Sequence, residues 1–210
     1  MNKKLKCIRM PKEMNKNKME KIRCKWCNVK NPSYIKYHDE EWGVPVYDDS
    51  ILLEFLILEP FQAGLSWETV LNKREDFRKE FLDYDPEKII QYAEEKIRKM
   101  LQNPKIIRNR RKIEAAINNT KVFLNIQKEW GTFSGYIWHF TDEEIVYETG
   151  KISSPLSDNI SKDMKKRGMK FIGTTTVYAY LQAIGVINSH DETCFMYKKV
   201  SREVVRWMRK

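Results

Sequence analysis

Cysteine and histidine residues gather near the two ends of the chain, where they could hold a metal ion. Cys24 and Cys27 precede His38 at one end, and His190 and Cys194 stand four residues apart at the other. Zinc prefers thiolate and imidazole ligands, usually four in a tetrahedron. A set made of Cys24, His38, His190 and Cys194 would tie the two ends together. Because such a set leaves no position for an activated water, the residues predict a structural zinc site.

The alternative is a catalytic zinc site of the nucleobase deaminase type. His38-Asp39-Glu40 matches the H-x-E half of that signature, and Cys24 with Cys27 matches the C-x-x-C half. In deaminases the cysteine pair follows the H-x-E, whereas here it comes first. The alternating strands and helices of a sheet-based deaminase are also missing, so this interpretation is disfavoured.

A second group combines aromatic rings with one acidic side chain. Tyr34, Tyr37, Trp42 and Trp67 lie in the same third of the folded region as Glu59, which ends an otherwise apolar segment. A lone buried carboxylate is costly unless it meets a cation or several hydrogen-bond donors. Each of these residues alone fits an ordinary core or helix end. Together they favour a pocket for a flat cationic base, held by stacking, cation–π attraction and a carboxylate contact.

A third candidate is a glycine-bounded turn between two expected helices. Residues 157–167 are expected to form one helix with Gly168 just after its end, and residues 174–184 a second helix. The turn from Gly168 to Gly173 would present backbone N–H groups at a helix N-terminus, and Lys170 adds positive charge there. The turn could bind a phosphate, although by itself it also fits an ordinary corner between helices.

Composition limits the class of protein that carries these groups. The 210 residues include 39 Lys and Arg against 29 Asp and Glu, which gives a net charge of +10 and favours a polyanionic partner such as nucleic acid. Much of this excess lies in residues 1–23, which lack the apolar core of a secretory signal. The longest apolar stretch, Ile51 to Pro60, is interrupted by two glutamates and is too short to span a membrane. We therefore expect a cytoplasmic protein.

Periodicity and capping signals predict an all-α fold. Asp49-Ser50 is expected to cap a helix up to Glu59-Pro60, Ser66 to cap one that runs past Phe81, and Asp85-Pro86 to begin another. Further helices are expected over residues 94–102 and 108–129. Short strands are possible near residues 144–147, but no run of alternating segments could form a sheet.

Several of these segments occur together, in order, in a known family. They are Cys24-Lys25-Trp26, the run from Tyr34 to Pro45, Leu58-Glu59 followed by the run from Gln62 to Trp67, the run from Lys165 to Thr174, and His190 with Cys194. Over residues 22–197 the chain resembles DNA-3-methyladenine glycosylase I, of the helix-hairpin-helix glycosylase superfamily. The resemblance implies an all-α fold of this kind, in which one structural Zn²⁺ joins the N- and C-terminal segments.

The resemblance also implies roles for individual residues. Glu59 would contact the damaged base. Recognition of the base is its favoured role, and action as a general base is the less favoured one. The other implied residues are the zinc ligands Cys24, His38, His190 and Cys194, the base-pocket residues Tyr34, Tyr37, Trp42 and Trp67, and the DNA-binding residues Gly64, Leu65, Gly168, Lys170 and Gly173. Cys27 remains the alternative to Cys24 as a ligand, and Pro60 stands where the family usually has a small residue.

The expected organisation is a flexible basic arm over residues 1–21, one glycosylase domain over residues 22–197 and a basic tail over residues 198–210. The expected activity is monofunctional: hydrolysis of the N-glycosidic bond of 3-methyladenine, with release of the free base and no strand cleavage. The expected partner is double-stranded DNA containing alkylated adenine, bound by a monomer. A non-enzymatic, zinc-stabilised DNA-binding protein is the alternative, but it gives no reason for a carboxylate beside DNA.

Overall fold

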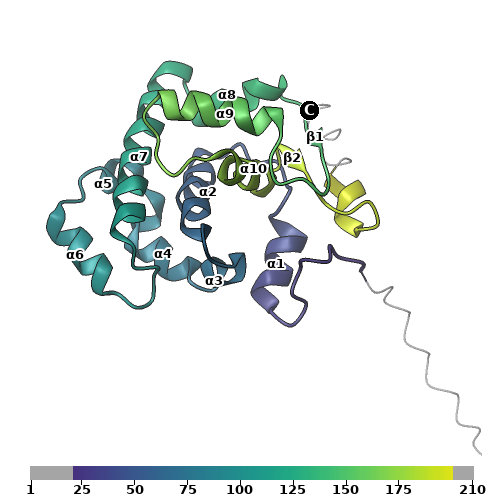
Figure 1. Ribbon diagram of the computed structural model, residues 1–210, viewed down its shortest axis with the longest axis horizontal. Coiled ribbons are helices and arrows are strands. Elements are labelled where there is room, and N and C mark those ends of the chain that lie inside the picture. The colour runs from purple at the N-terminus through teal and green to yellow at the C-terminus, as the bar shows by residue number, and fades with distance from the viewer. Residues whose placement is uncertain (1–20, 201–210) are drawn as a thin grey trace, which may run out of the picture.

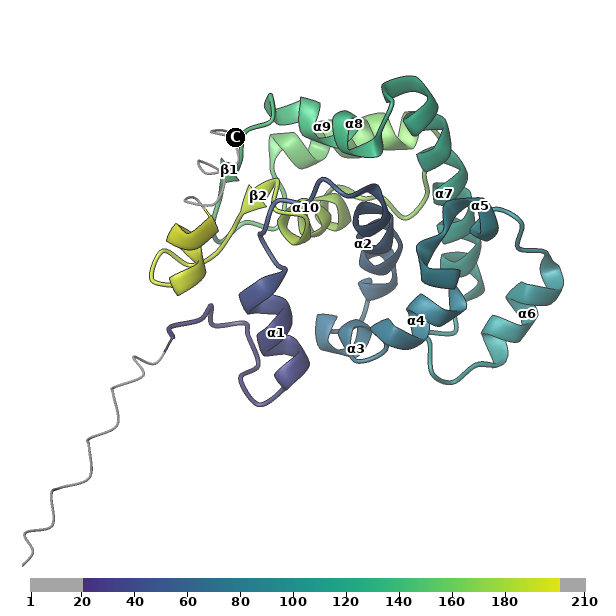
Figure 2. The same ribbon diagram turned by 180° about the vertical axis from the view of Figure 1, so that it is seen from behind.

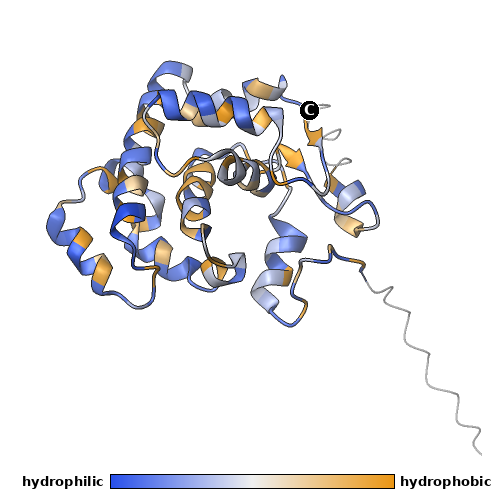
Figure 3. Cartoon of the chain, viewed as in Figure 1, coloured by the Kyte–Doolittle hydropathy of each residue, from blue (hydrophilic) through white to orange (hydrophobic). Residues whose placement is uncertain are grey.

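A central apolar helix, α2 (Asp49–Gln62), organises the structure (Figure 1). The structure is a computed structural model and describes residues 21–200. Every residue from Leu52 to Phe61 in α2 is buried, and a helix that is buried all round must be surrounded by other elements. Helices α7 (Arg110–Trp130), α8 (Phe133–Trp138) and α10 (Thr174–Ala183) contact it. In Figure 3, α2 is largely hydrophobic, whereas α9 presents a hydrophilic outer surface.

Helices make up nearly all of the regular structure in the described part of the chain (Figure 2). One short parallel pair of strands joins Val146 to Ile187 and Tyr147 to Asn188. The remaining elements are α1 (Pro32–Glu40), α3 (Trp67–Leu71), α4 (Arg74–Glu80), η1 (Leu82–Tyr84), α5 (Pro86–Ile89), α6 (Glu94–Gln102), η2 (His139–Thr141), β1 (Val146–Tyr147), α9 (Pro155–Lys166) and β2 (Ile187–Asn188). Of the predicted all-α class, the mostly helical character is confirmed, whereas the short sheet formed by β1 and β2 was not predicted.

Most of the predicted helix boundaries are confirmed. Ser66 caps α3 by accepting the Thr69 N–H, and Asp85 caps α5 with Pro86 in its first position. After α9, the N–H groups of Gly168 and Met169 donate to the carbonyls of Lys165 and Met164, the paired bonds of a Schellman motif. Local capping chemistry thus fixes where these helices begin and end.

Two details of the predicted helices are wrong. The helix expected from Ser66 past Phe81 is two helices, because the backbone leaves helical geometry at Lys73, whose ammonium donates to the Pro104 and Lys105 carbonyls. Helix α2 is capped by Asp48 instead of Asp49-Ser50. The Asp49 carboxylate instead accepts N–H bonds from the start of α8, and α2 continues past Pro60 to Gln62.

The first and last described segments lie side by side. The Phe195 N–H donates to the Ile22 carbonyl at 3.0 Å, and residues 195–200 are helical, with Val200 in the core. Of the predicted terminal regions, residues 1–20 and 201–210 lie outside the described residues. None of the described helices has the length and apolar character needed to cross a membrane.

Gly185, directly after α10, permits a close contact between two backbones. Its φ is +75°, and a Cβ at this position would lie 2.3 Å from the Val44 carbonyl carbon. Two backbone hydrogen bonds beside it, from Gly43 to Gln182 and from Val46 to Ile184, hold these segments together. No side chain can therefore fit between them.

We expect Gly185→Ala to lower the free energy of unfolding by about 3 kcal/mol or more, because the clash is with backbone and adds to the unfavourable φ. Gly131→Ala is the control: Gly131 has a φ of +82° with nothing near its Cβ, so only the backbone strain remains. Urea denaturation of both variants measures the difference. Equal losses would contradict the proposed clash.

Candidate functional site

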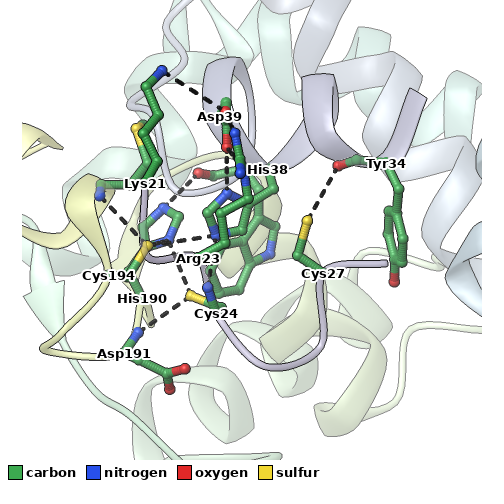
Figure 4. A network of polar contacts seen from close by, with 12 residues as sticks. Lys21, Arg23, Cys24, Cys27, Tyr34, His38, Asp39, His190, Asp191 and Cys194 are labelled. Carbon is green, nitrogen blue, oxygen red and sulfur yellow. Dashed lines mark hydrogen bonds and ion pairs between the residues drawn. The ribbon is translucent and has the colours of Figure 1, made fainter. Parts of the chain in front are cut away.

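Four buried side chains converge where the two ends of the described chain meet (Figure 4). Cys24 precedes α1, His38 lies in its last turn, and His190 and Cys194 follow β2. Their ligand atoms all lie within 4.8 Å of one another. The shortest sulfur–nitrogen distances are 3.4 Å from Cys24 to His190 and 3.5 Å from Cys194 to His38. These are the four residues that the sequence predicts as ligands.

Neighbouring groups orient both imidazoles towards the centre of this cluster. His38 Nδ1 lies 2.8 Å from the Asp39 carboxylate, which Arg23 also binds through two hydrogen bonds. His190 Nε2 lies 3.0 Å from the Trp42 carbonyl oxygen. Each of these acceptors favours a proton on the nitrogen that faces it, and so leaves the other nitrogen with a lone pair that faces the cluster. At His38 this nitrogen, Nε2, also accepts the backbone N–H of Cys24 at 3.2 Å. Metal-binding histidines are usually held in this way.

The donor set fits a tetrahedral metal ion. Bonds of about 2.3 Å to sulfur and about 2.0 Å to nitrogen place sulfur and nitrogen ligands about 3.5 Å apart, close to the distances above. Without a cation at the centre, burial raises the pKa of the Cys24 thiol to about 12 and lowers the pKa of His190 to about 4. A cation would stabilise the thiolate, and the neutral imidazole already suits it. The group could therefore bind a metal.

Cys27 lies outside the cluster. Its sulfur faces the Tyr34 carbonyl oxygen, at 3.9 Å, and is not among the four grouped ligands. The geometry therefore favours Cys24 over Cys27 as the ligand.

Beside the cluster is a cavity of about 350 Å³ with aromatic walls. Tyr37 and Trp67 lie with ring centroids 5.3 Å apart, and Trp26 meets Trp42 edge to face at 4.6 Å. Tyr34 and Glu59 also line the cavity, so the structure brings together all five residues of the predicted pocket. Its volume falls in the range of small-ligand sites.

The Glu59 carboxylate is the unusual group in this cavity. Glu59 is 5% exposed, and no hydrogen bond or ion pair to it is formed by any side chain of residues 21–200. Burial alone raises the pKa of its carboxyl group to about 8. The buried indole N–H of Trp67 likewise has no partner in the described structure. A ligand that brings positive charge and an acceptor would satisfy both groups.

The residues predicted to contact DNA lie at two other places. Gly64, with a φ of +83°, and Leu65, which is 42% exposed, follow the end of α2. Gly168 and Gly173 bound the turn between α9 and α10, and a Cβ at Gly173 would meet nothing within 4 Å. Gly173 is the N-cap of α10 and supplies no side chain, so the helix N-terminus stays accessible to an anion.

Several residues of this region were not predicted from the sequence. Trp26 and Lys151 also line the cavity, and the Lys151 ammonium is paired with Glu148 at 3.0 Å. Lys112 and Asn119, on α7, bind the backbone near both predicted DNA-contacting segments. For the last two, the signal available in the sequence was a lysine and an asparagine seven residues apart, hence on one side of the predicted helix.

Together, these features define a helical protein with an aromatic, acidic pocket beside a buried cluster of two cysteines and two histidines. Comparisons with known proteins identify its family. Residues 26–197 match the methyladenine glycosylase family. The chain is 41% identical over 181 residues to DNA-3-methyladenine glycosylase 1 of Escherichia coli (strain K12), covering 83% of this chain and 96% of that protein. The chain belongs to the methyladenine glycosylase family.

Solved structures agree with this assignment. A crystal structure of 3-methyladenine DNA glycosylase I superposes with a TM-score of 0.80 at 43% identity, covering 83% of this chain and 98% of that one. A structure of the Staphylococcus aureus enzyme, described as the structural basis of 3-methyladenine recognition, gives a TM-score of 0.77 at 34% identity, covering 80% of this chain and 92% of that one.

Burial of Glu59 predicts a specific dependence of stability on pH. The pKa of its carboxyl group is about 8 in the folded protein and 4.5 in its unperturbed state, so between these values the folded protein holds an extra proton. The contribution of Glu59 is therefore fully present below about pH 4.5 and is lost as the pH rises to about 8.

We expect Glu59→Gln to be more stable than the wild type at about pH 9, by a few kcal/mol, because the buried group no longer ionises. The difference should vanish near about pH 4. Urea denaturation across this pH range measures it, with Glu192→Gln, at an exposed position, as the control. Parallel pH profiles for wild type and Glu59→Gln would contradict the burial of an uncompensated carboxyl.

Proposed function

We propose that this protein hydrolyses the N-glycosidic bond of 3-methyladenine in alkylated DNA and releases the free base, as a step of base-excision repair. Its family membership and its relatives, which are named DNA-3-methyladenine glycosylases, support this activity. The observation that carries the proposal is the unpaired carboxyl of Glu59 inside an aromatic cavity. A flat base with a positive charge is the ligand that such a site favours.

In this proposal, the charge of the base provides the selectivity for 3-methyladenine over adenine. Methylation at N3 leaves a positive charge on adenine in DNA, which weakens the glycosidic bond, so little acid catalysis is needed. The cation would lower the pKa of Glu59 and favour its ionised form, whereas neutral adenine would leave the buried carboxyl without a partner. Tyr37 and Trp67 would stack on the base, with Trp42 and Tyr34 in the pocket wall. Recognition is thus the favoured role of Glu59.

DNA engagement is assigned to the two exposed backbone segments. Gly64 and Leu65 would enter the duplex where the damaged nucleotide has rotated out, since enzymes that act on a base remove it from the stack. The turn from Gly168 to Gly173, with Lys170, would hold phosphates as the hairpin of a helix-hairpin-helix motif. The net charge of +10 supports double-stranded DNA as partner. The proposal includes a monomer that acts in the cytoplasm.

The metal cluster is proposed to hold one structural Zn²⁺. Four protein ligands support a structural role, because they leave no position for the activated water that a deaminase needs. When bound, the ion would fix the segment around Cys24 against His190 and Cys194. The same segment carries Trp26, a wall of the base pocket.

Release of 3-methyladenine from methylated duplex DNA tests the activity. We expect Glu59→Gln to lower kcat/KM by about 10-fold to 100-fold, because the variant loses the charge that favours a cationic base. For the wild type, kcat/KM should rise with pH towards the Glu59 pKa of about 8, and the variant should lack this rise. Glu192→Gln is the control.

Each outcome separates the alternatives. No base release by folded, metal-loaded wild type would favour the non-enzymatic DNA-binding protein. Equal release by Glu59→Gln would keep the enzyme and remove Glu59 from its centre. A borohydride-trapped protein–DNA adduct that disappears in Lys151→Met would contradict release without strand cleavage.

Substitution of the proposed metal ligands provides a second test. We expect one zinc ion per chain by elemental analysis, and we expect Cys24→Ser to lose it and to unfold at a lower temperature, because a metal that binds only the folded state stabilises it. Cys27→Ser should keep both the metal and the melting temperature. The reverse pattern would make Cys27 the ligand.

A further inference from the structure

Two polar side chains are buried on one face of α7, where apolar residues would be expected. Lys112 is 7% exposed and Asn119 is 1% exposed. They are seven residues apart, which in an α-helix places them two turns apart on the same side, separated by about 10 Å along the axis. Burying polar groups is unfavourable unless they find partners, so their partners indicate what they do.

Lys112 binds the end of α2. Its ammonium group donates to the Phe61 carbonyl at 3.0 Å and to the Ala63 carbonyl at 2.7 Å. The last carbonyls of a helix lack partners within the helix, and a cation there also complements the helix dipole. No carboxylate within the described residues forms an ion pair with Lys112. Ala63 directly precedes Gly64 and Leu65, the segment proposed to enter the duplex.

Asn119 binds the turn between α9 and α10. Its side-chain N–H donates to the Lys170 carbonyl at 2.9 Å, and its side-chain oxygen accepts the Lys170 N–H at 2.8 Å. The neighbouring Asn118 donates to the Gly168 carbonyl at 2.8 Å. The turn proposed to hold phosphates is therefore attached to α7 at both its first glycine and its lysine.

We infer that α7 sets the spacing between the segment at Gly64-Leu65 and the turn at residues 168–173, with Lys112 and Asn119 as the positioning residues. This inference rests on the proposed function, in which both segments contact the same DNA. One segment must enter the duplex while the other holds phosphates nearby, so a small error in their separation would weaken the simultaneous contact. Neither residue touches DNA or the base in this role.

A purely structural role explains these bonds less well. Hydrogen bonds inside a protein contribute only about 1 kcal/mol net, because the same groups would otherwise bind water. The turn and the end of α2 lie next to exposed residues and could use water instead. What the buried bonds add is direction, since each fixes one backbone segment against a rigid helix.

The test compares base binding with DNA binding in Lys112→Met and Asn119→Leu, which keep side-chain volume and lose the polar contacts. Lys121→Met and Asn125→Leu, at exposed positions of α7, are the matched controls. We expect both test variants to bind free 3-methyladenine within about twofold of the wild type, because the pocket keeps its walls. We expect their affinity for a duplex with an abasic site to fall about 10-fold, the effect of losing one well-made buried contact.

The double variant gives the sharper readout. When two substitutions act independently, at sites more than about 7–10 Å apart, their fold-losses in DNA affinity multiply. If α7 sets the spacing, one broken attachment already uncouples the segments, and the double variant should lose little more than the weaker-binding single variant. Lys112→Arg, which keeps a cationic donor, should recover most of the DNA affinity lost in Lys112→Met. Melting temperatures show which variants are folded.

Wild-type DNA affinity in both folded single variants would overturn the inference, and so would multiplied losses in the double variant. A parallel loss of free-base binding would also overturn it, because the residues would then support the pocket instead of the spacing. Absence of base release by the wild type would count against the proposed function, whereas an active wild type with unaffected variants would count against this inference alone.

Discussion

The buried carboxyl of Glu59 is the constraint around which the site is built. A buried carboxylate without a donor or cation is unstable, and burial raises the Glu59 pKa to about 8. The empty pocket therefore favours the neutral acid. A bound base that carries positive charge reverses this preference, whereas an uncharged base of similar shape does not. In the proposed function, the same desolvation that weakens the folded protein at high pH would thus provide discrimination between damaged and normal adenine.

The walls of this pocket depend on contacts outside it. His190 bonds to the Trp42 carbonyl, and Trp42 meets Trp26 at 4.6 Å, so the Cys/His cluster and the cavity share one aromatic wall. Trp26 follows Cys24 by two residues, which ties its position to that ligand. A metal bound at the cluster would therefore stabilise the shape of the pocket without touching its ligand. This arrangement explains why chain ends that are distant in sequence must meet for a pocket to form.

Local chemistry made much of the fold and site predictable from the sequence. Caps such as Ser66 and Asp85 act on the next few residues, and Gly168 ends its helix through its own backbone. The pocket residues were predictable through a family resemblance that covers residues 22–197. Features set by distant partners were not predictable. At the break between α3 and α4, Lys73 bonds to the Pro104 and Lys105 carbonyls, and Asp49 acts as a cap for α8, more than 80 residues away.

In the proposed function, helix α2 links base recognition to base extrusion. Glu59 lies in its last turns, and Gly64 and Leu65 follow its end, so a shift of α2 would move the proposed recognition group and the segment proposed to enter DNA together. The turn at residues 168–173 belongs to a different pair of helices, α9 and α10. If the turn holds phosphates as proposed, binding to undamaged DNA would need only this turn and the basic charge, whereas excision would also need α2 in its place against the turn. In the proposed function, discrimination would therefore reside in α2 and its pocket, and a contact that fixes α2 against the turn at residues 168–173 would convert general DNA affinity into productive binding.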